Sequence, residues 1–268
     1  MIFFKPNDKG PHIAGHPLQG GDPGGARRMT TILEDKGNMM VVLTIVSVIL
    51  SIAIGLSWLS PVLQVAALFP FFAAAMKGHH HHRSLALTVR WTGVVFATTV
   101  AVGVFVPDQV GQSVLFARLS TATITNWLGA TDAPPPADFR YLLWGIAVFL
   151  VATLLSGGLL GLLLTSITLG NAAVGALFFF RYGSNVIQIS LVAVPLWHWG
   201  LIGAAVFMLV PASLPFFERL VKIERVAEDR RVLANFMYIG GAFLVTSMLL
   251  RLATADLWRN ILREWTIF

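Results

Sequence analysis

The sequence predicts an all-α, polytopic integral membrane protein with about seven transmembrane helices. Hydrophobic residues make up 56% of the 268-residue chain and charged residues 12%, whereas soluble domains carry roughly 25% charged residues. The apolar stretch 141–217 contains one permanently charged side chain, that of Arg181. As one continuous helix it would be about 115 Å long, several times the roughly 30 Å of a bilayer core. The chain therefore crosses the membrane repeatedly.

The first part of the chain combines a polar tail with three apolar segments. Residues 1–37 hold prolines among glycines and show no overall helical or strand periodicity, so we expect an N-terminal tail that is disordered or ordered by a partner, with a short interfacial helix as an option over 30–36. Residues 38–58, 61–76 and 85–106 are the first three predicted spans. The second is short, and Pro61 suits the first turn of its helix.

A long connection, 107–140, is predicted to lie outside the membrane. Its segment 110–128 alternates apolar clusters with polar residues, which favours a helix lying at the membrane surface. The run Pro134-Pro135-Pro136 then predicts a stiff extended segment.

The stretch 141–217 divides into three segments. Residues 141–163 form a clear span, in which Gly157 and Gly161 have the spacing that lets another helix pack closely. We expect a turn over 165–171, then an interrupted segment, 171–194, and a further span over 200–217.

The chain ends with a charged loop, a span and an amphipathic segment. The loop covers 218–231 and the last span 232–250. Residues 252–268 place Leu257, Trp258, Ile261, Leu262 and Trp265 on one helical face, which predicts a C-terminal helix in the membrane interface. The predicted organisation is a tail over 1–37, a transmembrane domain over 38–251 and this helix.

The basic residues predict an orientation. With seven spans, twelve Lys and Arg lie in the N-terminal tail and in the loops 77–83 and 218–231, and five lie on the opposite side. This asymmetry favours a cytoplasmic N-terminus in a plasma membrane, with anionic lipid at the basic loops. We attribute the net charge of +6 to it and expect no nucleic-acid binding. Six spans are the alternative, because a basic C-terminal helix prefers the anionic cytoplasmic leaflet.

Arg181 heads a set of candidate site residues. A cation at membrane depth is costly, so such a residue usually faces a cavity, a partner or the membrane surface. Either Arg181 lines a polar pathway or pocket, or it marks the membrane surface between two shorter apolar segments. The polar side chains that would complete such a pocket are Asn171, Asn185, Gln188 and His198.

Two groups of histidines are weak candidates for metal or haem binding. His79, His80, His81 and His82 form a run beside the membrane, but metal sites usually collect ligands from separate elements. His198 stands between two tryptophans, as in an aromatic belt at the membrane surface. We predict no cofactor, since a haem held by two histidines needs a second histidine at the same depth.

The remaining polar residues disfavour catalysis. All 13 Asp and Glu lie outside the predicted spans, and the chain has no cysteine. We therefore expect a non-catalytic subunit or scaffold of a larger membrane complex, partnered by other membrane subunits or by a second copy. The alternatives are a permease or channel component with a pathway around Arg181, and a haem- or quinone-associated electron-transfer subunit.

Overall fold

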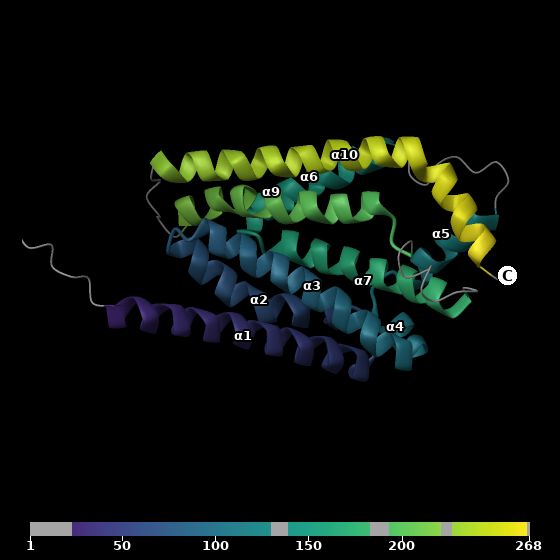
Figure 1. The fold of residues 1–268 in the computed structure, drawn as a ribbon, viewed down its shortest axis with the longest axis horizontal. Helices are drawn as coiled ribbons and strands as arrows, with labels where there is room; N and C mark the ends of the chain where they lie inside the picture. Colours follow the sequence, from purple (N-terminus) through teal and green to yellow (C-terminus); the bar gives the residue numbers. More distant parts are fainter. Residues whose placement is uncertain (1–22, 130–138, 183–192, 221–226, 267–268) are drawn as a thin grey trace, which may run out of the picture. The chain divides into compact units, whose positions relative to one another are not determined.

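The computed structural model describes residues 23–129, 139–182, 193–220 and 227–266, and their secondary structure is helical. The described helices are α1 (Pro23–Ile54), α2 (Leu59–Lys77), α3 (His81–Phe105), α4 (Pro107–Ser113), α5 (Ala117–Gly129), α6 (Phe139–Ser156), α7 (Leu159–Tyr182), α9 (Leu196–Leu220) and α10 (Ala227–Trp265) (Figure 1). The predicted all-α class is confirmed.

Six of these helices are long and apolar enough to cross a bilayer. They are α1 from Lys36, α2, α3, α7, α9 up to Arg219 and α10 from Arg230. Helix α6 contributes a shorter apolar segment, Leu142–Ser156. The chain is therefore a membrane protein whose described part has six helices of spanning length, against the seven expected.

Helix α1 begins earlier than expected. It starts at Pro23, so residues 23–37 are helical, whereas the sequence predicted only a short helix over 30–36; residues 1–22 lie outside the described part. Pro23 fits this position because its missing N–H has no partner in the first turn of a helix. Contacts divide the chain into two units, Met1–Lys36 and Gly37–Phe268.

Helix α7 is the centre of the second unit. About 61% of its most apolar window is buried, compared with 22% for α10. It contacts α2, α3, α5, α6 and α9, and the core around it includes the fully buried Phe72, Trp91 and Leu162. The peripheral α10 packs along α9 (Figure 1).

The reversal between α6 and α7 lies at Gly157-Gly158, not over 165–171. Both glycines have positive φ, +62° and +94°, a conformation that costs other residues energy. The Gly158 N–H donates to the Thr153 carbonyl over 2.9 Å and closes the turn. Residues 165–171 are consequently the middle of α7. Gly161 does pack closely, because a Cβ there would lie 2.8 Å from Leu209 of α9.

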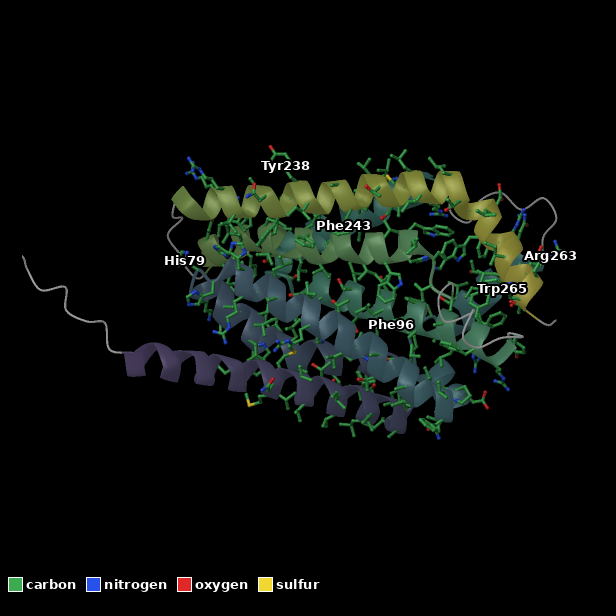
Figure 2. The ribbon with its side chains drawn as sticks, viewed as in Figure 1. His79, Phe96, Tyr238, Phe243, Arg263 and Trp265 are labelled. Carbon is green, nitrogen blue, oxygen red and sulfur yellow. The ribbon has the colours of Figure 1, made fainter. Side chains whose placement is uncertain are left out.

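The C-terminal segment is not a separate helix. Helix α10 continues for 39 residues to Trp265 and bends near its end (Figure 1). Part of its predicted apolar face packs against protein, since Leu262 is buried in a cluster with Leu128 of α5 and Phe179 of α7. Trp265 joins this cluster, whereas Arg263 points outward (Figure 2).

Helices α4 and α5 occupy the predicted surface segment 110–128. A turn at Phe116, with φ of +67°, separates the two. Helix α5 packs against α7 and α10, so the connection after α3 covers the end of the bundle.

Candidate functional site

Arg181 lies at the end of α7, where it forms an ion pair. Its Nη1 atom donates to Oδ1 of Asp108 over 3.0 Å, and the side chains are 54% and 81% exposed. Asp108 is in the first turn of α4, directly after α3 ends. The two charges therefore meet at one end of the helices, which is the arrangement expected for a surface position. Asn185 and Gln188 lie outside the described residues.

Asn171 attaches the surface helix α5 to α7. Its Nδ2 atom donates to the carbonyls of Leu115 over 3.0 Å and Ile167 over 2.8 Å. Its Oδ1 atom accepts a hydrogen bond from the Ser120 hydroxyl over 2.8 Å. The amide therefore fixes the turn before α5, and it is largely occupied by these bonds.

His198 lies in the first turn of α9, on the wall of a cavity of about 490 Å³ that Asn171 also lines. The Pro195 carbonyl accepts a hydrogen bond from the backbone N–H of His198, so the residue before α9 caps the start of this helix. The structure thus brings together two predicted residues, Asn171 and His198. Arg181 lines a different surface hollow, together with Asp108.

Arg251 of α10 lines the same cavity as Asn171 and His198, and it directly follows the last predicted span, 232–250. It shares a helical face with Ala255, Trp258 and Leu262, at intervals of four, three and four residues. Since these three residues are buried or packed, this spacing contained the signal that Arg251 faces inward.

A second polar cluster, missed from the sequence, lies inside the bundle. The buried Gln64 of α2 donates through Nε2 to the Ser60 hydroxyl over 3.0 Å and accepts at Oε1 from the Ser166 hydroxyl over 2.6 Å. The Trp91 indole donates to the backbone carbonyl of Gln64 over 3.0 Å. The Ser51 hydroxyl donates to that of Ser60 over 3.2 Å. These bonds join α1, α2, α3 and α7.

The histidine run spans the connection between α2 and α3, where His79 lies (Figure 2), and continues into the first two residues of α3. His81 is buried at the start of α3, and the rings of His79 and His81 lie 6.2 Å apart. The His82 ring contacts Phe236 of α10 at 5.2 Å. Within the described ranges, no three His, Cys, Asp or Glu side chains form a group that could hold a metal ion.

The chain matches no protein-family model, and comparisons with curated proteins and with solved structures found no match.

Proposed function

We propose that the chain is a non-catalytic integral membrane subunit or scaffold of a larger membrane complex. The position of Arg181 carries this proposal. A pathway residue would face a polar route through the bilayer, whereas Arg181 is half exposed at the end of α7 and pairs with the exposed Asp108.

The interior polar groups support a structural role. Gln64 accepts a hydrogen bond from Ser166 of α7, and Asn171 accepts one from Ser120 of α5. In membranes such bonds between helices contribute to helix association. Both side chains are thereby committed to holding the bundle together.

The outward face of α10 is the surface we propose for a partner. Tyr238, Val245 and Leu249 are 76%, 56% and 61% exposed, and Tyr238 points away from the other helices (Figure 2). Gly241 lies on the same face with open space around it. A small residue within an apolar stripe permits the close approach of another transmembrane helix.

The orientation is part of the proposal. Lys77, Arg83, Arg219, Arg230 and Arg231 lie at or near the helix ends opposite to α4 and α5. Because basic residues favour the cytoplasmic side of a plasma membrane, we assign these ends, and with them the N-terminal side of the second unit, to the cytoplasm.

Cross-linking tests this function, since the natural chain has no cysteine to interfere. Cysteines introduced as Val245→Cys and Leu249→Cys should form cross-links to a partner subunit or a second copy in native membranes. Val206→Cys, buried in α9, is the matched control and should form none. Purification in mild detergent should give a stoichiometric complex heavier than the 29.2 kDa chain. A monomer without cross-links that transports a solute by itself in liposomes would contradict the proposal.

A permease or channel component is the second candidate, favoured by the shared cavity of Asn171 and His198. In that case His198→Ala should change flux while expression and thermal unfolding stay normal. Arg181→Ala, which alters an exposed ion pair worth about 0–1 kcal/mol, should leave flux unchanged. A haem-associated role for His198 predicts a Soret band in the purified protein, and we expect none.

A further inference from the structure

A second cavity lies beside the one that His198 and Arg251 line. Its volume is about 390 Å³, and its walls come from α6, α7 and α9, with Leu244 of α10. Three residues, Ile167, Thr168 and Leu201, line both cavities. The two spaces therefore adjoin one another and form one groove, which we call the α6–α9 groove.

The inner part of this groove is apolar. Phe149, Ile202 and Met208 are among its walls. Its two hydroxyls are engaged within α7, because Thr165 donates to the Gly161 carbonyl over 2.8 Å and Thr168 to the Leu164 carbonyl over 2.9 Å. Such a lining favours a hydrocarbon chain.

The outer part of the groove is also lined largely by apolar side chains, but it holds the groove's charged group. Among the described residues that line it, Arg251 carries the one permanent charge. His198 and the indoles of Trp127 and Trp197 lie around the same space. The Ser120 and Asn171 side chains bond to each other, and Asn171 also binds two backbone carbonyls. The charged and titratable side chains around this space are those of Arg251 and His198.

This polarity follows the depth of a bilayer. The outer part lies where α9 begins, where the apolar run 232–250 of α10 ends, and beside the surface helix α5. The inner part lies between the apolar segments of α6, α7 and α9. A bilayer lipid has the same order, with its headgroup at the interface and its chain in the core.

We propose that the α6–α9 groove binds one membrane amphiphile with a hydrocarbon chain and an anionic phosphate headgroup, the headgroup lying against Arg251 and His198. Arginine suits this headgroup because its planar guanidinium can donate two parallel hydrogen bonds to a phosphate. The combined cavities fall within the roughly 300–1,000 Å³ of small-molecule sites. The site is separate from the basic loops at the opposite helix ends, and it is independent of whether the chain has a protein partner.

Binding is tested with the full-length protein in an uncharged detergent. The probe is dodecyl phosphate, and the comparison compounds are dodecanol, dodecyltrimethylammonium and inorganic phosphate. Native mass spectrometry counts bound molecules, and thermal unfolding measures stabilisation, since a ligand that binds the folded state raises Tm. We expect one dodecyl phosphate per chain, with a rise in Tm that the three comparison compounds do not reproduce.

Two variants divide the site into its parts. Arg251→Gln should weaken dodecyl phosphate binding about tenfold, because it removes a charged hydrogen-bond donor. Arg118→Gln is its control, since it removes an exposed charge from α5 outside the groove. Leu201→Trp should abolish binding by filling the junction of the two cavities. Leu43→Trp, on the exposed face of α1, should leave it unchanged.

Several outcomes would overturn the proposal. Equal binding of dodecyl phosphate by the natural chain, Arg251→Gln and Leu201→Trp shows that the groove is not the site. Equal stabilisation by dodecyltrimethylammonium or dodecanol shows that charge is not recognised, and equal stabilisation by inorganic phosphate shows that the apolar part is not used. If Arg251→Gln fails to fold, Arg251→Lys replaces it, because lysine keeps the positive charge. Arg251→Lys should bind dodecyl phosphate more weakly than the natural chain does, but more tightly than it binds dodecanol.

Discussion

Gln64 takes part in two hydrogen bonds between helices, one through its side chain and one through its backbone. It is buried, and its amide joins Ser60 of its own helix to Ser166 of α7, while its backbone carbonyl accepts a hydrogen bond from Trp91 of α3. A polar group in a dry interior is costly unless it is bonded, so the three helices must keep their relative register to satisfy this one residue.

Gln64→Leu should therefore destabilise the fold. The change keeps the volume but leaves the Ser166 hydroxyl without its partner on α2, and we expect a loss of about 1–2 kcal/mol. Thermal unfolding in mild detergent measures it. Gln112→Leu, on the exposed face of α4, is the control and should cause little change. Equal stability of the two variants would mean that the Gln64 bonds contribute nothing net.

Gly157 has a conformation that other residues avoid. Gly157→Ala should lower the unfolding free energy by about 1–2 kcal/mol, because an L-residue is strained at φ of +62°. Its Cβ would also meet the ring of Phe216 on α9. Gly93→Ala is the opposite control: Gly93 is inside α3 with open space around it, and alanine favours a helix by up to about 1 kcal/mol. A drop in Tm for Gly93→Ala, or none for Gly157→Ala, would contradict this account.

At the scale of helices, the closest pairing joins α9 and α10. Gly200 faces the Ser247 hydroxyl, and a Cβ on Gly203 would lie 3.4 Å from the Phe243 ring. On the other helix, a Cβ on Gly240 would lie 2.7 Å from Met208. Phe243 consequently lies between the two helices (Figure 2), where its ring stacks with that of Phe207.

Gly200→Val should separate these helices. The added methyl groups would overlap Ser247, and overpacking of this kind typically costs about 1–3 kcal/mol. Gly93→Val, in α3, meets nothing within 4 Å and is the matched control. Thermal unfolding curves compare the stability of the two variants. A Gly200→Val protein as stable as Gly93→Val would show that the close approach of α9 and α10 is not required.

Helix boundaries were predictable where proline or charge marked them. The predicted span that begins at Pro61 has boundaries within a few residues of those of α2. The predicted span that ends before Pro107 agrees equally well with α3. The boundary at Gly157-Gly158 was missed, because a glycine pair in an apolar run favours close packing and a left-handed turn equally well. Gln64 was missed for a related reason. A single amide among apolar residues does not reveal which side chains of distant helices it will meet.

The candidate site was predictable in part. Asn171 and His198 do line one cavity, but Arg181 does not belong to it. Arg251 escaped notice because α10 was expected to end its span one residue earlier, which assigned the guanidinium to the outside water. Arg251 faces the cavity because α10 continues beyond it. This continuation is stabilised by the packing of Leu262 against α5, which the sequence does not reveal.

At the scale of the whole second unit, the packing of Leu262 against Leu128 predicts where the C-terminal segment lies. It places the end of α10 beside α5, at the same helix ends as the Arg181–Asp108 pair. The histidine run lies at the opposite ends. We therefore expect an odd number of crossings between Gly37 and Trp265.

Single-cysteine labelling in intact cells tests this topology. Gln112→Cys and Arg263→Cys should both react with a membrane-impermeant maleimide from outside, and Lys77→Cys should react only after permeabilisation. The unsubstituted chain, which has no cysteine, is the background control. Labelling of Arg263→Cys only after permeabilisation would favour six crossings.

The shortness of α6 has a consequence for the surrounding bilayer. Its apolar segment Leu142–Ser156 is about 22 Å long at roughly 1.5 Å per residue, less than a bilayer core of about 30 Å. The tight reversal at Gly157-Gly158 prevents the helix from extending further. The bilayer beside α6 would therefore thin locally to match it. Such hydrophobic mismatch would favour thinner membranes for this protein. It would also shorten the path that a lipid chain takes past α6 when it leaves the bilayer.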